Sequence, residues 1–296
     1  MFKKLFISPI VRMILVFVLI TLLSFIFPAT RALANDFLGL FRVQRVVVLP
    51  IDSFGMEKTI GTETFGSALS KLISNSTLVI DEAEEPVFVA DIEQANKIAN
   101  FEARLPKDFI PSEITVFDST SFVITIDRFK AQSLLDSAGR NDIQLPDEID
   151  GAEILVNIPS AIRVNLGNCN EVDVISINCI LFSQMPSPTA DVPDDLNMSE
   201  LIKISLELSG MDNQKADEFV SNLDWTTTLI IPIPTYSTIE QDIIVDGVSG
   251  KLIQKTGQTE AEARYILLWV KDGVIYAISG SGTDAMFALV IADTLP

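Results

Sequence analysis

Two β-hairpin signatures near the C-terminus constrain the fold of this chain more than any other feature. In residues 243–250 and again in residues 265–279, an Asp-Gly pair separates two runs rich in β-branched and aromatic side chains. Asp-Gly favours the two-residue turn of an antiparallel hairpin. If the second Asp-Gly pair is such a turn, Trp269 faces Tyr276 across the strands, which is a favourable aromatic pair. The C-terminal part of the chain therefore predicts antiparallel sheet.

Hydrophobic periodicity elsewhere predicts helices between further strands. Helices are expected at residues 62–74, 91–100, 128–138, 199–208, 212–222 and 283–295. Additional strands are expected at residues 43–50, 77–80, 87–89, 114–117, 122–126, 152–158, 162–166, 172–177 and 225–233. The strands at 114–117 and 122–126 are expected to pair with each other. Asp91 with Gln94 is a capping-box-like start, and Ser199 and Thr283 are expected to cap the helices that they begin. Antiparallel hairpins interleaved with separate helices predict an α+β fold in which helices pack on one face of the sheet.

A stretch rich in Pro, Ser and Asp at residues 184–197 is the best linker candidate. We therefore expect a boundary near residue 190. It divides the chain after the leader into an N-terminal α+β section, residues 35–190, and a C-terminal α+β section, residues 191–296. Whether the two sections share one sheet or form two is left open by the sequence.

Residues 1–34 predict where the protein works. Basic side chains precede an uninterrupted apolar run from Met13 to Phe27, and small residues at Ala32 and Ala34 follow. The run would make about 22 Å of helix, which is short for a membrane span and suits the core of a signal peptide. Two interpretations stay open: a signal peptide cleaved after Ala34, or an uncleaved anchor that crosses the membrane through residues 13–27. Both place residues 35–296 outside the cytoplasm, anchored to the cell membrane or secreted.

Composition excludes several classes of function. The 296-residue chain contains no histidine, so Ser-His-Asp and Cys-His nucleophile systems and histidine-rich zinc sites are impossible. Its 40 acidic and 21 basic residues give a net charge of −19, which argues against nucleic acid as a partner. Residues 1–34 hold four basic and no acidic side chains, so the exported part carries about −23. This charge favours solubility, and an acidic binding face is the alternative.

Cys169 and Cys179 lie ten positions apart in the exported part. A disulfide between them would contribute about 2–3 kcal/mol through loop entropy. Two buried free thiols are the alternative, and a metal pair is disfavoured because histidine and a second cysteine pair are both absent. Acidic pairs such as Asp194-Asp195 could serve a glycosidase or bind calcium, but solvated turns explain them more simply. The same holds for Glu148 with Asp150. No catalytic residue, metal ligand or cofactor is therefore expected.

Several segments resemble exported bacterial proteins that carry the domain of unknown function DUF4367. The likeness lies in "FLGLFRVQRVVVLPID" from Phe37, in residues 91–106, 144–159 and 224–234, and in the closing "VDGVSGKLI…ILLWVKDGVIYAISG…DAMFALVIADTL". Such domains often accompany sigma-factor and anti-sigma systems on the outer side of a single membrane span. The closing hairpin and helix are also similar to the lipoprotein-carrier and RseB-like half-barrel group, which holds lipid in an apolar concavity.

The resemblance implies sensing, regulation or carriage, and it carries no catalytic residue onto this chain. It supports a half-barrel-like sheet and an apolar cavity lined by Trp225, Trp269 and Tyr276, although strand-spaced apolar residues are more often core. The first hypothesis is a non-enzymatic exported sensory or regulatory domain that acts through an envelope protein partner, such as an anti-sigma-type protein. The second is a carrier of a lipid or lipidated peptide, and the least favoured is a carboxylate hydrolase.

Overall fold

The structure is a computed structural model that describes residues 43–51, 59–60, 63–167, 169, 179–208, 210–234, 238–257 and 264–296. Contacts divide the chain into two compact units, Met1–Arg42 and Val43–Pro296. The first unit lies outside the described residues, and with it the expected signal or anchor segment. The strand expected at residues 172–177 also lies outside them. All of the described residues belong to the second unit.

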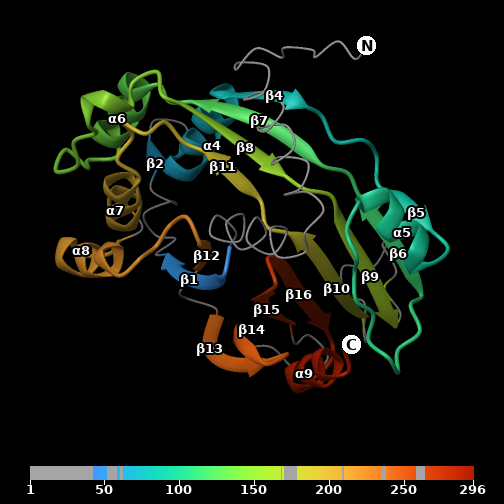
Figure 1. Ribbon diagram of the computed structural model, residues 1–296. Coiled ribbons are helices and arrows are strands. Elements are labelled where there is room, and N and C mark those ends of the chain that lie inside the picture. The colour runs from blue at the N-terminus through green and yellow to red at the C-terminus, as the bar shows by residue number, and fades with distance from the viewer. Residues whose placement is uncertain are drawn as a thin grey trace, which may run out of the picture. The chain divides into compact units, whose positions relative to one another are not determined.

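The described residues form an α+β fold with six α-helices, one 3-10 helix and sixteen strands (Figure 1). The helices are α4 (Phe65–Asn75), α5 (Ile92–Ala99), α6 (Arg128–Ser137), η1 (Asp147–Ile149), α7 (Met198–Leu208), α8 (Asn213–Ser221) and α9 (Ala285–Asp293). The strands are β1 (Arg45–Ile51), β2 (Thr59–Ile60), β3 (Glu63–Thr64), β4 (Thr77–Asp81), β5 (Val87–Val89), β6 (Glu113–Phe117), β7 (Thr120–Thr125), β8 (Glu153–Ile158), β9 (Ala161–Gly167), β10 (Cys179–Pro186), β11 (Thr189–Asp191), β12 (Thr228–Pro234), β13 (Thr238–Val245), β14 (Val248–Lys255), β15 (Arg264–Lys271) and β16 (Val274–Ser281).

The largest sheet is antiparallel and has the strand order β13-β14-β15-β16-β10-β9-β6-β5. Both predicted hairpins lie in it. Asp246 and Asp272 begin the two turns, each with φ 53°, and the following glycines also have positive φ. Trp269 pairs with Tyr276, as the sequence predicts. Asp-Gly therefore sets the register of both hairpins through its turn geometry.

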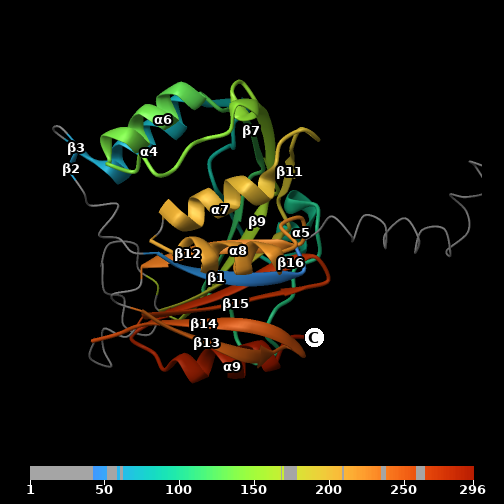
Figure 2. The same ribbon diagram turned by 90° about the vertical axis from the view of Figure 1, so that its left-hand side faces the viewer.

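The two faces of the eight-stranded sheet are covered differently. Helices α5 and α9 pack small side chains such as Ala95 and Ala288 on one face, over the largest apolar core. On the other face lies a ribbon formed by β1 and β12, which pair in parallel although they are far apart in the chain. Helices α7 and α8 pack on the outer side of this ribbon, through Leu206 and Ala216 (Figure 2). The ribbon is thus a layer between the sheet and this helix pair.

A second sheet, ordered β11-β8-β7-β4, packs with α4, α6 and α7 around a separate core that includes Phe65, Leu135 and Ile204. Four pairs of consecutive strands, β4–β5, β6–β7, β8–β9 and β10–β11, each divide between the two sheets. The predicted pairing of the strands at 114–117 and 122–126 was therefore wrong. The corner Asp118-Ser119 contains no glycine, so it does not supply the turn that a tight hairpin requires, and the chain passes from one sheet to the other.

The predicted linker was wrong over its first part. Residues 184–186 belong to β10, which lies between β9 and β16 in the centre of the eight-stranded sheet, and residues 189–191 form β11. Strands before and after the expected boundary near residue 190 therefore share one sheet, and Val43–Pro296 is one compact unit. Proline ends β10 and polar residues follow it, which is why the composition alone resembled a linker.

Helix ends follow the expected chemistry with small shifts. Asp91 accepts a hydrogen bond from the Gln94 amide at 2.8 Å and so caps α5, as predicted. Ser199 lies inside α7, and Asn197 accepts from the Glu200 amide instead. For α9 the cap is Asp284 rather than Thr283. No helix in the described ranges has the length and apolar character needed to cross a membrane.

Candidate functional site

The predicted disulfide between Cys169 and Cys179 is present, with an S–S distance of 2.05 Å. It joins the chain just after β9 to the first residue of β10, where Cys179 pairs with Gly167 across the ladder. Neither residue is therefore a free thiol. Such a bond is consistent with an oxidising, extracytoplasmic environment.

The structure brings two of the three candidate cavity residues together and leaves Trp225 apart from them. Trp269 and Tyr276 stack at 5.2 Å between ring centroids, and both stack on Phe182 of β10. All three rings are buried in the main core, so Trp269 and Tyr276 lie within packed rings. Trp225 is half-buried in the turn before β12 and does not belong to this stack. Sequence reasoning missed Phe182 because its partner strands were unknown.

A cluster of charges lies beside the stacked rings. Asp246 accepts from Arg104 Nη2 at 3.0 Å and from Lys271 Nζ at 2.7 Å, and Trp269 Nε1 donates to it at 3.3 Å. Burial by itself would raise the pKa of Asp246, but hydrogen bonds from the two cations more than offset this and hold the pKa below its ordinary value. The hydrogen bond to Asp246 likewise raises the pKa of Arg104. Because Asp246 forms an ion pair with each of the two cations inside the fold, we interpret the cluster as structural.

The segment that carries Arg104 is held to the sheet by Gln184. The Gln184 side chain is fully buried and accepts from the Arg104 backbone N–H at 2.7 Å while donating to its carbonyl at 2.8 Å. One amide side chain thus completes a strand-like pair of hydrogen bonds. This arrangement explains a fully buried polar residue in β10, because both of its polar atoms are satisfied.

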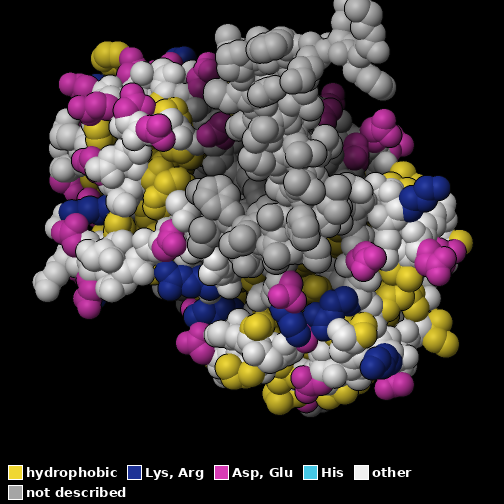
Figure 3. All heavy atoms as spheres, viewed as in Figure 1, with side chains coloured by type: hydrophobic (Ala, Val, Ile, Leu, Met, Phe, Trp, Pro, Cys, Tyr) yellow, Lys and Arg dark blue, Asp and Glu magenta, His cyan; other side chains and the backbone are white. Residues whose placement is uncertain are grey.

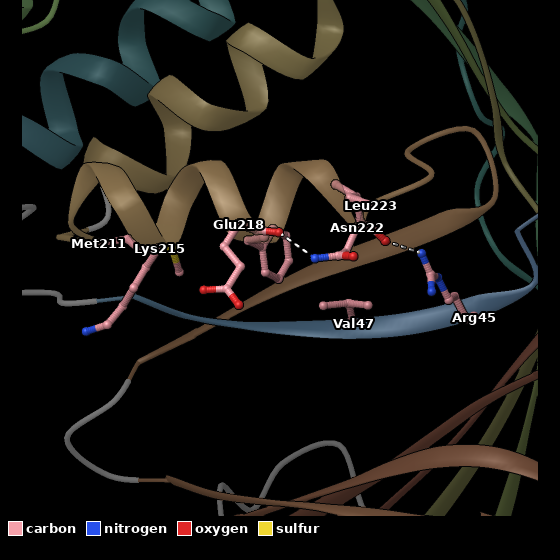
Figure 4. A pocket seen from close by; sticks show the side chains of 8 residues that line it. Arg45, Val47, Met211, Lys215, Glu218, Asn222 and Leu223 are labelled. Atoms are coloured by element: carbon pink, nitrogen blue, oxygen red, sulfur yellow. Dashed lines mark hydrogen bonds between the residues drawn. The ribbon is translucent and has the colours of Figure 1, made fainter.

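The candidate binding site is a groove between α8 and β1 with a volume of about 410 Å³ (Figure 4). Its lining combines an apolar floor with a polar rim. The floor consists of Val47, Met211, Phe219 and Leu223, and the rim of Arg45, Lys215, Glu218 and Asn222. We call this the α8–β1 groove.

Local hydrogen bonds hold the rim in place. Arg45 donates from Nη2 to the Asn222 carbonyl at 3.3 Å and from Nε to Thr228 Oγ1 at 2.9 Å, which ties β1 to the end of α8 and to β12. Asn222 Nδ2 donates to the Glu218 carbonyl at 2.8 Å. Glu218 extends from α8 toward β1, and Val47 extends from β1 toward the helix (Figure 4). The groove therefore presents apolar surface with charges of both signs beside it.

Two further hollows adjoin each other at the Tyr265 end of the sheet. One, of about 330 Å³, is mainly apolar and includes Leu181, Ile253 and Ile266 next to Cys179. The other, of about 400 Å³, lies at the beginning of α9 and is more polar. The Tyr265 hydroxyl pairs with Thr283 Oγ1 at 3.0 Å, and burial raises its pKa.

The acidic pairs considered in the sequence lie in turns. Asp194 and Asp195 are exposed. Asp150 accepts from the Arg128 amide at 3.1 Å, an interaction that orients the start of α6, and Glu148 is exposed in η1. Within the described ranges no three His, Cys, Asp or Glu side chains are grouped so that they could hold a metal ion.

The fold and this groove define the chain as an α+β protein that contains a disulfide and a surface groove. Comparisons with models of protein families, with curated proteins and with solved structures found no match. The resemblance to the DUF4367 and half-barrel proteins stays a prediction.

Proposed function

We propose that this protein is an exported, non-enzymatic sensory or regulatory domain that acts through an envelope protein partner. The α8–β1 groove is the observation that carries the proposal. An apolar centre surrounded by polar and charged groups is the usual anatomy of a protein interface. The groove has room for one or two apolar side chains of a partner, and Arg45, Lys215 and Glu218 can meet charges of either sign at its rim.

The chemistry of the groove supports binding better than catalysis. Among its lining residues, Glu218 is the only carboxylate and no hydroxyl or thiol nucleophile accompanies it. Covalent and acid–base mechanisms commonly use two reactive groups within hydrogen-bond reach of each other, and the lysine of the groove, Lys215, pairs with Asp212 at 3.0 Å instead of with Glu218. We therefore infer that the groove recognises side chains rather than transforms a substrate, as in an anti-sigma-type regulator.

Site-specific photocrosslinking tests this proposal. Lys215 and Lys130 are matched positions: each follows a capping Asp by three residues, and their side chains are 75% and 74% exposed. A photoreactive residue at position 215, beside the groove, should capture one envelope protein in cells, whereas position 130 on α6 should not. Equal capture at both positions, or none at position 215, would contradict the proposal.

A lipid or lipoprotein carrier remains the second candidate, because the apolar hollow beside Cys179 has Ile266 at its surface, 42% exposed. In this proposal the eight-stranded sheet acts as the half-barrel-like wall against which an acyl chain lies. Mass spectrometry of a solvent extract from the purified exported protein tests it. A stoichiometric lipid that is lost in Ile266→Glu, but kept in Ile244→Glu, would support carriage. A ligand-free protein would contradict it.

The proposal includes the N-terminal segment, residues 1–34, as either a signal peptide or a membrane anchor. If it is a signal peptide, N-terminal sequencing of the exported protein should find Asn35 first. If residues 13–27 anchor the protein, the sequence should begin at Met1 or Phe2 and the protein should remain with the cell membrane.

A further inference from the structure

One stretch of the described surface is exposed without interruption. All of residues 78–88 are exposed; we call them the exposed edge segment. It begins with three consecutive apolar residues, Leu78, Val79 and Ile80, which are 68%, 52% and 59% exposed. It ends with Val87 and Phe88, which are 43% and 59% exposed. Exposed apolar groups on this scale are typical of interaction surfaces.

The segment includes parts of two strands that are the last in their sheets. Strand β4 pairs only with β7 among the described strands, and β5 pairs only with β6. An edge strand presents unpaired backbone N–H and C=O groups along its free side, so it is a template for another strand. Asp81 ends β4, and the connection to β5 bears Glu82, Glu84 and Glu85; Figure 3 shows acidic side chains where this segment joins β4 to β5.

Strand β13 forms the edge of the eight-stranded sheet that lies opposite β5, and it shows how charged side chains protect a strand edge. Strand β13 carries Glu240 and Asp242, and both pair with Lys251 of the neighbouring strand, at 2.6 and 2.7 Å. Charged residues on an edge discourage added strands. Strand β4 has no charge before Asp81. Its apolar edge is therefore not protected in this way.

The acidic turn is fixed, and no cation among the described residues neutralises its charges. The Glu84 amide donates to Asp118 Oδ2 at 3.1 Å, and Thr120 Oγ1 donates to the Asp81 carbonyl at 2.8 Å. None of the four acidic side chains in the segment forms an ion pair with a described residue. The turn thus presents fixed negative charge next to a strand edge that no described strand occupies.

We propose that the exposed edge segment binds an extended segment of the partner protein, which adds as a strand to β4. The added strand places apolar side chains against Leu78, Val79 and Ile80 and Lys or Arg side chains opposite the acidic turn. A second copy of this chain fits less well, because its net charge of −19 opposes association with another copy. This inference rests on the proposed partner-binding function and names the chemistry of the partner.

A synthetic peptide that alternates Lys with Val is the probe, and hydrogen exchange of the full exported chain is the readout. The peptide should protect amides in residues 77–81, and a Glu-Val peptide of equal length should not. Added salt should weaken the binding because exposed charges are screened. Equal protection by both peptides, or none by the Lys-Val peptide, would overturn the inference. So would protection that rises with protein concentration when no peptide is present, since a second copy would then occupy the edge.

Matched variants locate the interaction. Leu78→Lys should weaken peptide binding by about tenfold or more, whereas Ile244→Lys on β13, 73% exposed, should leave it unchanged. Glu84→Gln/Glu85→Gln should lower the affinity and its salt dependence, whereas Asp194→Asn/Asp195→Asn, also an exposed adjacent pair, should not. Thermal unfolding shows whether each variant is folded. An unchanged affinity in folded Leu78→Lys contradicts strand addition at β4.

Failure of this inference differs from failure of the proposed function. If the Lys-Val peptide does not bind but crosslinking at position 215 still captures one envelope protein, strand addition is wrong and the partner-binding function stands. If the peptide binds while crosslinking captures nothing, the edge is a strand acceptor and the α8–β1 groove is not the partner site.

Discussion

At the scale of single residues, Asp246 has two roles: its backbone forms a turn, and its carboxylate binds two cations. Its backbone adopts φ 53° at the start of the β13–β14 turn. Its carboxylate holds Arg104 and Lys271 over the main core. Asp272 begins the β15–β16 turn with the same φ, and its side chain forms no ion pair with any described residue. The two positions therefore separate the turn requirement from the charge requirement.

Asp246→Asn should lower the free energy of unfolding at pH 7 by about 2 kcal/mol, because it leaves partly buried cations without their carboxylate. Asparagine also tolerates positive φ, so the turn is kept. Asp272→Asn is the matched control and should change stability little. Denaturant unfolding of both variants measures the difference, and equal losses would show that the charge cluster contributes nothing.

The same residue sets a pH dependence. A pKa held below the ordinary value of 3.8 means that ionised Asp246 stabilises the fold above that pH. This stabilisation is lost as the pH falls through the lowered pKa. The stability difference between the native chain and Asp246→Asn should therefore shrink below about pH 4. A difference that stays constant down to pH 2 would contradict this assignment.

Gly280 is required by a close approach rather than by its backbone conformation. A Cβ atom at this position would lie 2.2 Å from Cζ of the buried Tyr265 ring. We expect Gly280→Ala to destabilise the protein by about 1–3 kcal/mol through overpacking. In the background Tyr265→Leu, the same substitution should cost much less, which a double-mutant cycle by thermal unfolding would measure. If the losses of unfolding free energy from the two substitutions were additive, contact with Tyr265 would not be the source of the strain.

At the scale of elements, the disulfide acts on the connection between β9 and β10. It closes a loop of sequence separation 10 beside the central strands of the large sheet. Cys169→Ser/Cys179→Ser should lower the free energy of unfolding by about 2–3 kcal/mol, mainly because the unfolded chain gains loop entropy. Denaturant unfolding of the variant, with the reduced native chain as control, checks this. Thiol titration of the native protein under denaturing conditions should find no free thiol.

Element order also explains why strand pairing was predicted unevenly. Hairpins with Asp-Gly turns carry their register in the turn itself, so Trp269 opposite Tyr276 could be predicted. The strands β6, β7, β8 and β9 carry no such signal, because their partners are decided by which core each side chain enters. The pair Asp118-Ser119 has the composition of a short loop whether the chain forms a hairpin or passes to another sheet. Only tertiary packing distinguishes these two outcomes.

At the scale of the whole molecule, the large sheet makes the described unit indivisible. Strand β10 lies between β9, which precedes it, and β16, which comes from the C-terminus. Phe182 of β10 stacks on Trp269 and Tyr276, both beyond residue 190. Neither section can complete the main core alone.

We therefore expect residues 35–190 and residues 191–296, produced separately, to lack cooperative thermal unfolding, while residues 35–296 should show it. Either section alone would leave the core rings exposed along an open sheet edge. Circular dichroism on heating measures this, with the intact exported chain as control. A cooperative transition in either section alone would restore the predicted boundary near residue 190.

The sequence by itself predicted the α+β class, both C-terminal hairpins and the cap of α5, and it favoured the Cys169–Cys179 bond over two free thiols. Each of these depends on residues close together in the chain, whose turn, cap and loop energetics are local. Only the tertiary structure decided the parallel β1–β12 ribbon, the central place of β10 and the burial of Gln184. The α8–β1 groove and the exposed edge segment were decided in the same way. These features join residues far apart in sequence, and their energies come from shared burial that no local pattern records.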